Sequence, residues 1–306
     1  MTTAHGAGRP TRVADLTAGS VEYRLERHGP GTVVMLHGGH MRAGLPLGEE
    51  VFAKAGFSVL ALSRPGYGRT PVTTGTSPDG FADVIAELCG RLSIAEVAAV
   101  VGQSAGGPTA IALAARHPGL VRRLILESAV GFLPWPGRRT RLAGNLLFAP
   151  RTEAATWALT HALMRRAPQA GLRLLLRDLT ARPVGPVLAG LDETHRAALL
   201  ELFTRMRSGS GFRTDLRHMK AAGPGRDGGD ERARRAAQVT QPTLIIASPD
   251  DGAVAYAQAE ALAGTIPGAR LVTSRAESHM IWFSEDYPAI AADIAAFLTT
   301  EGTASP

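Results

Sequence analysis

The sequence predicts an α/β fold built on a mostly parallel, three-layer sheet, and two observations support this. Apolar runs of four to six residues, typical of strands covered on both faces, alternate along the chain with helical segments. Between residues 131 and 238 the alternation stops and only helices are predicted, so a helical insertion interrupts the sheet. A chain of 306 residues is long enough for one such core and its insertion.

The first part of the chain predicts most of the sheet. Residues 1–10 are expected to form a disordered tail, and residues 21–25 alternate apolar and polar, as in an edge strand with one wet face. Further on, buried strands alternate with helices. The strands are predicted at 32–36, 57–62, 97–101 and 121–126, and the helices at 49–55, 79–92 and 110–116.

The second part contains the insertion and the return to the sheet. Helices are predicted at 142–148, 153–166, 170–179 and 194–206, followed by a polar, turn-rich linker at 223–230. Strands at 242–247 and 270–273 and helices at 255–263 and 285–299 complete the fold. The predicted division is therefore a core of residues 11–130 and 239–301 with a helical cap at 131–238.

Composition and charge exclude several functional classes. The net charge of +6 comes from arginines scattered among acids, which favours solvated surfaces over a nucleic-acid site. No stretch is long and apolar enough to span a bilayer, and residues 1–10 lack a secretory signal, so we expect a cytoplasmic protein without a membrane partner. Cys89 is the single cysteine, which excludes an internal disulfide. No metal, no cofactor, and either a monomer or a dimer are expected.

The strand at 97–101 leads into Gly102-Gln103-Ser104-Ala105-Gly106, followed by a helix. A serine between small residues in a strand-turn-helix setting is typical of a nucleophile elbow, whose tight turn leaves no room for bulky neighbours. The turn places Ser104 at the positive end of the helix, where the Ala105 N–H can stabilise an oxyanion. The alternative is an ordinary strand-to-helix turn.

Two further residues follow the ends of predicted strands. Asp251 comes after the strand at 242–247, and His279 after the strand at 270–273. Because the carboxyl ends of parallel strands share one edge of the sheet, we expect both near Ser104, in the chain order Ser, Asp, His. A serine needs a base to take its proton, and a histidine base needs an acid to fix its tautomer.

A glycine pair also follows a buried strand, in His37-Gly38-Gly39-His40. The backbone there can approach the elbow closely, and the Gly39 N–H is the candidate second oxyanion donor, beside that of Ala105. A plain glycine turn is the alternative. His40 is a candidate pocket residue, as are four others: Gln103, Trp135, Trp157 and Trp282.

Together these motifs make the chain resemble the α/β-hydrolase superfamily over nearly its whole length. The resemblance implies an eight-stranded sheet, a helical cap, Ser104 as nucleophile, His279 as general base and Asp251 as the acid. One departure is Ser248, which stands three residues before the acid where the family usually has glycine; the choice of Asp251 over Asp250 therefore rests on spacing and on the following glycine. Glu127 occupies the alternative acid position used by some members.

A serine nucleophile excludes the aspartate-dependent branches of this fold and favours acyl transfer. We expect hydrolysis of an ester or lactone of a small, hydrophobic molecule through an acyl-enzyme on Ser104. His40-Met41 stands where proline-cleaving relatives show Pro-Gly, which disfavours a peptidase. Two alternatives stay open: C–C cleavage or a biosynthetic cyclisation by the same triad, and a ligand sensor with slow turnover.

Overall fold

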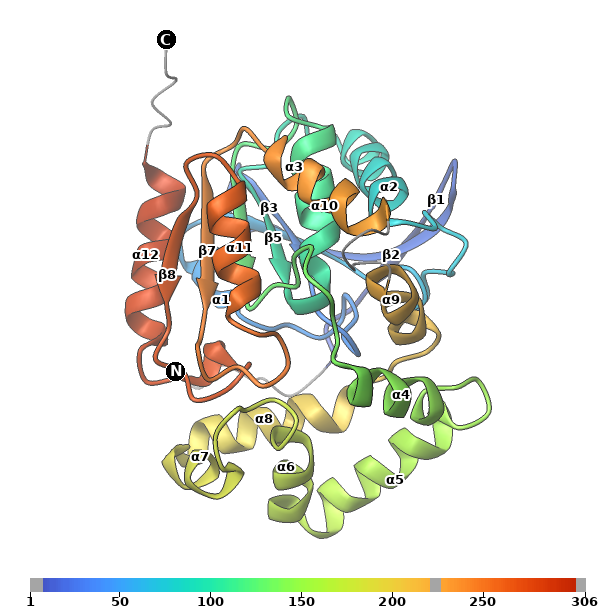
Figure 1. Cartoon of the computed structure of the whole chain (residues 1–306). Coiled ribbons are helices and arrows are strands. Elements are labelled where there is room, and N and C mark those ends of the chain that lie inside the picture. Colours follow the sequence, from blue (N-terminus) through green and yellow to red (C-terminus); the bar gives the residue numbers. More distant parts are fainter. Residues whose placement is uncertain (1–7, 221–226, 301–306) are drawn as a thin grey trace.

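The computed structural model describes residues 8–220 and 227–300, and its core is one eight-stranded sheet (Figure 1). The strands lie in the spatial order β1-β2-β4-β3-β5-β6-β7-β8. β1 and β2 pair antiparallel, as do β2 and β4, whereas β3 to β8 pair parallel. This confirms the predicted fold class. The strands are β1 (Arg12–Leu16), β2 (Gly19–Glu26), β3 (Thr32–Leu36), β4 (Ser58–Leu62), β5 (Ala99–Gln103), β6 (Leu124–Glu127), β7 (Thr243–Ala247) and β8 (Arg270–Thr273).

The five strands β3 to β7 are buried along their whole length, which explains their continuous apolar sequences. β1 was not predicted. Four of its five residues are exposed or half-buried, so it carries no apolar signal and is held by backbone pairing with β2. An edge strand of this kind is invisible to hydrophobic periodicity.

Helices cover both faces of the sheet and form the outer two layers. α2, α3, α10 and α11 pack with one another on one face, and α1 packs with α12 on the other. α2 begins after Ser77, whose side chain accepts a hydrogen bond from the Gly80 N–H. The bounds are α1 (Glu50–Lys54), α2 (Pro78–Arg91), α3 (Gly107–Arg116), α10 (Asp227–Ala237), α11 (Ala257–Thr265) and α12 (Tyr287–Thr299).

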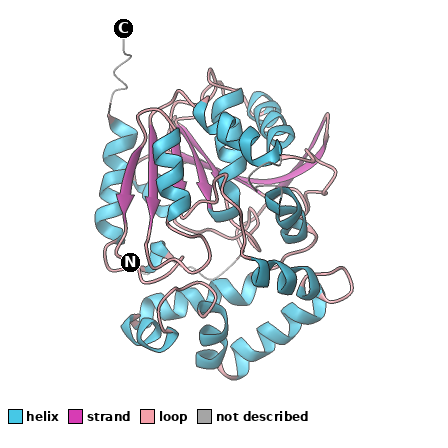
Figure 2. Cartoon of the chain, in the orientation of Figure 1, coloured by secondary structure: helices cyan, strands magenta, loops and turns pink. Residues whose placement is uncertain are grey.

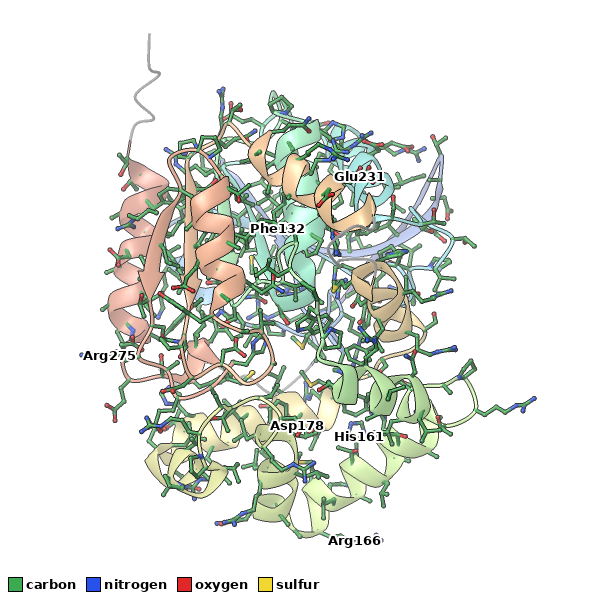
Figure 3. The ribbon with its side chains drawn as sticks, viewed as in Figure 1. Phe132, His161, Arg166, Asp178, Glu231 and Arg275 are labelled. Carbon is green, nitrogen blue, oxygen red and sulfur yellow. The ribbon has the colours of Figure 1, made fainter. Side chains whose placement is uncertain are left out.

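Most of the insertion after β6 forms a separate layer of helices below the sheet edge in Figure 1, and Figure 2 shows this layer without strands. Residues 211–220 and 227–237 lie above this layer, against the core. Among the described residues between 131 and 238 there is no strand. α4, α5, α6 and α8 correspond to predicted helices, while α7 and α9 were not predicted. The bounds are α4 (Arg138–Leu147), α5 (Glu153–Arg166), α6 (Pro168–Leu176), α7 (Val184–Gly190), α8 (Glu193–Arg205) and α9 (Gly211–Lys220). In Figure 3, Arg166 lies at the outer end of this cap, away from the strands.

Two local predictions need correction. The linker predicted at 223–230 is wrong from Asp227 onward, where α10 begins; residues 223–226 lie outside the described part. α10 packs on α3 and α11, and its Ala236 is buried in the core, so tertiary contacts override the helix-breaking glycines. The predicted tail lies mostly outside the described residues, but the Arg9 N–H donates to the Gly44 carbonyl, so residues 8–10 join the core. Nothing in the described chain forms a helix that could cross a membrane.

Candidate active site

Ser104 sits at a sharp turn between β5 and α3. One 3₁₀ turn, η1 (Ser104–Gly106), joins the two elements, and Ser104 has a φ of +49°. A positive φ is strained for a residue with a side chain, and such strain concentrates at functional sites. The helix start leaves the Ala105 N–H without an intrahelical partner, as an oxyanion donor requires. The geometry is that of the predicted elbow.

The turn tolerates only small residues on its flanks. A Cβ on Gly102 would lie 2.7 Å from the Ala110 Cβ, and one on Gly106 would lie 2.0 Å from the Leu36 carbonyl oxygen. Neither contact can relax without moving the backbone, because β3 and α3 are packed in the core. The spacing of glycines around Ser104 is thus a steric requirement.

Gly106→Ala is expected to lower the free energy of unfolding by about 3 kcal/mol, since its Cβ would overlap the backbone of β3. Gly90→Ala is the matched control: it lies in α2 with nothing within 4 Å of the added methyl group and should raise stability by about 0.5–1 kcal/mol. Urea unfolding of both variants checks this. Equal effects of the two substitutions would contradict the steric argument.

The structure brings His279 and Asp251 together at the carboxyl edge of the sheet. The His279 Nδ1 lies 2.6 Å from the Asp251 Oδ2. The Asp251 Oδ1 accepts hydrogen bonds of 2.8 Å from the N–H groups of Ala253 and Val254, so both carboxylate oxygens are engaged. Asp250, by contrast, is 39% exposed and faces Arg182 at 3.6 Å. The geometry selects Asp251 as the partner of His279.

Ser104 and His279 meet the same short segment, which follows β6. The Val130 N–H donates to the Ser104 carbonyl at 2.9 Å, and the Ser128 Oγ donates to the His279 carbonyl at 3.2 Å. The His279 N–H in turn donates to the carbonyl of Leu179, in the cap, at 2.7 Å. These contacts gather the three candidate residues from β5, β7 and β8 at one edge of the sheet.

The loop after β3 runs alongside the nucleophile candidate. A Cβ on Gly38 would lie 2.8 Å from the Ser104 Cβ, and one on Gly39 would lie 3.2 Å from the Phe212 ring. The loop is held by Arg64, whose Nε donates to the His37 carbonyl at 2.8 Å. Gly38 therefore packs against Ser104, and Gly39, the next residue, faces Phe212; the oxyanion role of the Gly39 and Ala105 N–H groups stays a prediction.

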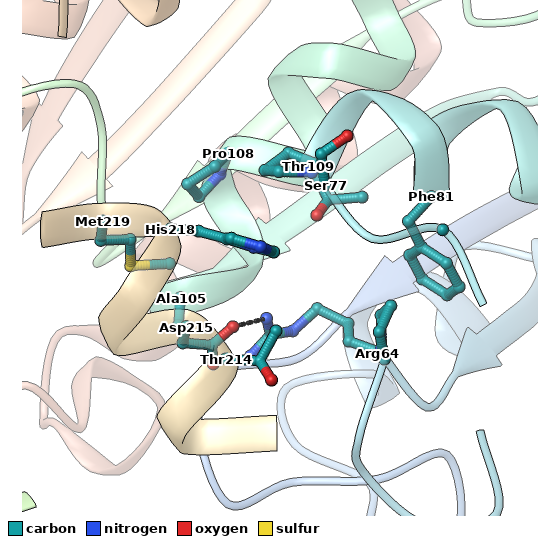
Figure 4. Close-up of a pocket in the computed structure, with 13 residues that line it drawn as sticks. Arg64, Ser77, Phe81, Ala105, Pro108, Thr109, Thr214, Asp215, His218 and Met219 are labelled. Carbon is teal, nitrogen blue, oxygen red and sulfur yellow. Dashed lines mark hydrogen bonds and ion pairs between the residues drawn. The ribbon is translucent and has the colours of Figure 1, made fainter. Parts of the chain in front are cut away.

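Arg64 belongs to a buried ion pair that the sequence analysis missed. It donates to both oxygens of Asp215 in α9, at 2.6 and 2.8 Å (Figure 4). The Tyr67 hydroxyl also donates to Asp215, at 2.6 Å. Burial alone would lower the pKa of Arg64, but the Asp215 carboxylate outweighs this effect and raises it. The pair ties the cap to the oxyanion loop. Its members are 151 residues apart, so no local pattern could reveal it.

Gln103 and Trp282 have their polar groups engaged in buried hydrogen bonds. The fully buried Gln103 side chain accepts from the His37 Nδ1 at 2.8 Å and donates to Glu127 at 2.8 Å and to the Leu47 carbonyl at 3.0 Å. The Trp282 indole N–H also donates to Glu127, at 3.0 Å. Neither residue lines the two cavities described below, and their place in the substrate pocket stays a prediction. Glu127 contacts them and not His279.

Burial raises the pKa of Glu127 from 4.5 to about 7, against the opposing hydrogen bonds from Gln103 and Trp282. The unfolded chain loses this proton at lower pH than the folded one, so stability falls as pH rises from about 4.5 to 7. The loss is about 3 kcal/mol. Glu127→Gln is expected to remove this pH-dependent loss, so the stability of the variant relative to wild type increases as pH rises across this range. Urea unfolding at several pH values checks this, with substitution of the exposed Glu260 by Gln as control. If the free energy of unfolding of Glu127→Gln changed with pH in parallel with that of wild type, the prediction would be wrong.

The remaining predicted pocket residues lie where the cap meets the core. Trp135 is buried in a cluster with Ala105 and Phe212, and its indole N–H donates to the Ala253 carbonyl at 2.7 Å. Trp157 and His40 approach each other with ring centroids 5.3 Å apart. Aromatic side chains from the cap thus cover the oxyanion loop.

Two cavities lie near the site. The first, of about 20 Å³, opens between α9 and α3 beside Arg64, His218 and Thr109 (Figure 4), and its volume suits one water. The second, of about 340 Å³, lies at the seam of cap and core against Ser278 and Met280, on either side of His279. Its cap wall is apolar, formed by Leu176, Val187, Leu191 and Leu199. Within the described ranges, no three His, Cys, Asp or Glu side chains are grouped to hold a metal.

Comparisons with known proteins bear on the fold and the family of the chain. The sequence model of a family described as alpha/beta hydrolase fold matches residues 31–286. The uncharacterized hydrolase YcgS of Bacillus subtilis is 30% identical over 280 residues, covering 90% of this chain and 94% of that protein. A 2-hydroxy-6-oxononadienedioate/2-hydroxy-6-oxononatrienedioate hydrolase of Paraburkholderia phymatum is 29% identical over 167 residues, covering 50% of this chain and 58% of that protein.

A solved structure also superposes on the chain. The alpha/beta hydrolase fold protein from Nakamurella multipartita has a TM-score of 0.76 at 23% identity, covering 94% of this chain and 99% of that one. At this identity the likeness concerns the fold. From the family match and the extended similarity to the Bacillus hydrolase, the chain belongs to the α/β-hydrolase fold family and is a hydrolase of that fold.

Proposed function

We propose that this protein is a serine hydrolase that cleaves an ester or lactone of a small, hydrophobic molecule through an acyl-enzyme on Ser104. The observation that carries the proposal is the 2.6 Å contact between His279 and Asp251. Ser104, held at a strained turn, bonds to the same segment, residues 128–130, as His279 does. A serine, a histidine and a buried acid in this order are the parts that acyl transfer needs.

The mechanism follows from the hydrogen bonds of the site. Asp251 accepts a hydrogen bond from the His279 Nδ1–H, which leaves the Nε2 lone pair free to act as base. As the Ser104 Oγ attacks the carbonyl carbon, its proton passes to this Nε2. The oxyanion that forms is stabilised by the N–H groups of Gly39 and Ala105.

Collapse of this intermediate breaks the bond to the leaving oxygen, which takes the proton from His279. Water then attacks the acyl-enzyme, with His279 again accepting a proton, and the acid product leaves Ser104 with its proton restored. Every proton is returned, so the cycle needs no group beyond water.

The surroundings favour a small apolar substrate. The rings of His40, Phe148, Trp157 and Phe212 lie over the oxyanion loop, and the 340 Å³ cavity beside His279 has an apolar cap wall. A volume of this size holds a small ligand. The opposite wall of that cavity carries Arg275, Glu277, Glu285 and Asp286, so the apolar preference rests on the cap side.

Hydrolysis of a C–C bond is the second candidate. The Paraburkholderia relative carries the name of a dienedioate hydrolase, and its similarity extends over half of this chain. The same triad geometry serves both reactions, so the distinction lies in the substrate carbon skeleton and in the product.

The test is turnover of 4-nitrophenyl esters of graded acyl length, aryl lactones and a 2-hydroxy-6-oxodienoate, with products identified by mass spectrometry. We expect turnover of the esters or lactones, with the highest kcat/KM for apolar acyl groups. Faster cleavage of the dienoate would favour the second candidate. Binding of the compounds without turnover would point to a ligand sensor and overturn the hydrolase proposal.

A further inference from the structure

His40 occupies an unusual place next to the predicted oxyanion donor Gly39. Its φ is +65°, a conformation that glycine adopts freely but that costs a residue with a side chain about 1 kcal/mol. The imidazole ring lies 4.3 Å from the Phe212 ring and 4.8 Å from the Phe148 ring, measured between centroids. These rings come from the cap, where α4 and α9 approach the core (Figure 1). The strained backbone of His40 therefore places its imidazole among these aromatic rings.

The protonation of the ring follows from its hydrogen bonds. The Trp157 indole N–H can only donate, and it donates to the Ser208 Oγ at 2.9 Å. The His40 Nδ1 lies 2.7 Å from this oxygen, and the pairing that gives the Ser208 proton an acceptor has the hydroxyl donate to Nδ1. With Nδ1 as acceptor, the ring proton of a neutral His40 sits on Nε2.

The ring is neutral at physiological pH. Burial, and secondly the charge of Arg64, lower the pKa of His40 to about 3. The ring is nevertheless only partly enclosed, and its Nε2 is not among the sealed, unpartnered polar atoms of the described chain. No described residue bonds to this nitrogen. The Nε2–H thus remains open to the space between core and cap.

We propose that the Nε2–H of His40 forms a subsite for a neutral hydrogen-bond acceptor, such as a ketone oxygen, on the acyl part of the substrate. The proposal rests on the proposed acyl transfer and names its substrate class: an aromatic acyl group that carries an oxygen acceptor. Phe212 contacts both Gly39 and His40, so the imidazole lies one side chain away from the candidate oxyanion donor. A carboxylate costs more to desolvate among these aromatic rings than an uncharged donor restores, which favours a neutral acceptor.

The first arm of the test needs no turnover. Ser104→Ala enzyme with ¹⁵N-labelled histidine is titrated with methyl 4-acetylbenzoate and, as the isostere without an acceptor, methyl 4-ethylbenzoate. We expect the free enzyme to show the His40 proton on Nε2, and only the acetyl compound to shift that ¹⁵N signal. A proton on Nδ1, or equal shifts with both compounds, would overturn the subsite.

The second arm compares kcat/KM for the 4-nitrophenyl esters of the same two acids. The readout is the ratio of the acetyl to the ethyl ester, so a general loss of activity cancels. His40→Phe keeps a ring but removes the donor, and the ratio should fall three- to tenfold from the wild-type value. His40→Gln restores an N–H and should recover part of the ratio.

Two further variants sharpen the comparison. Ser208→Ala removes the hydroxyl that holds the proton on Nε2, so the ratio should lie between wild type and His40→Phe. His195→Phe makes the same exchange on α8, where the ring faces Phe283, and should leave the ratio unchanged. A His40→Phe ratio within twofold of wild type would overturn the subsite while ester hydrolysis stands. If neither ester is hydrolysed, the proposed function fails and the NMR arm alone decides the subsite.

Discussion

Ser104→Ala is expected to abolish labelling by a fluorophosphonate and to lower kcat for ester hydrolysis by about 10⁴- to 10⁶-fold. The Oγ is the atom that forms the acyl bond in the proposed cycle, and no neighbouring group can replace it. The elbow itself should survive, because alanine removes one oxygen and leaves the +49° turn and its close contacts unchanged. The loss is therefore chemical and not a loss of folding.

Intact mass and peptide mapping check this result. Wild type should gain one adduct, on Ser104, and His279→Ala should lose it as well, since the hydroxyl is then no longer activated. Ser93→Ala is the matched control, because Ser93 also has a positive φ, of +57°, but lies in the loop after α2. An adduct on any other residue, or one that persists in Ser104→Ala, would refute the nucleophile assignment.

Asp251→Asn is expected to lower kcat by about 10⁴-fold with little change in structure. The Asp251 Oδ1 accepts two backbone N–H groups, so the amide oxygen of asparagine will keep that position. The amide NH₂ then faces the His279 Nδ1 and forces this nitrogen to accept. The ring proton moves to Nε2, where the lone pair is needed, and His279 can no longer take the proton of Ser104.

Asp250→Asn supplies the control within the same loop. Asp250 is half-exposed and paired with Arg182 across 3.6 Å, and such surface pairs contribute little. Its substitution should leave kcat within about twofold of wild type. Single-turnover acylation rates, with circular dichroism to verify folding, separate the two variants. A larger loss of kcat in Asp250→Asn than in Asp251→Asn would show that Asp250, and not Asp251, is the acid.

The sheet could be predicted because its evidence is local. Buried strands such as β3 and β5 are continuous apolar runs, and the elbow glycines report a steric need inside one turn. β1 and α10 were not predicted, because both depend on contacts with other segments. β1 depends on backbone pairing with β2, and α10 depends on packing against α3, and neither interaction leaves a pattern in its own segment.

The candidate site divides in the same way. The strand-end positions of Ser104 and His279 follow from the rule that parallel strands share a carboxyl edge, so they were visible in the sequence. The supporting contacts were not. Arg64 and Asp215 meet across 151 residues, and Gln103 turns inward toward His37 and Glu127 because the elbow backbone directs it there.

By itself, the sequence determined the buried strands and most of the helices, the elbow, and the edge of the sheet at which chemistry can occur. Only the tertiary structure decided which of two adjacent carboxylates meets His279, and that the His40 Nδ1 pairs with the Ser208 hydroxyl. Both outcomes depend on hydrogen bonds between segments far apart in the chain: the Asp251 loop with His279, and Trp157 and Ser208 with His40. Such bonds form only when folding brings these segments together, so their geometry is absent from any local pattern.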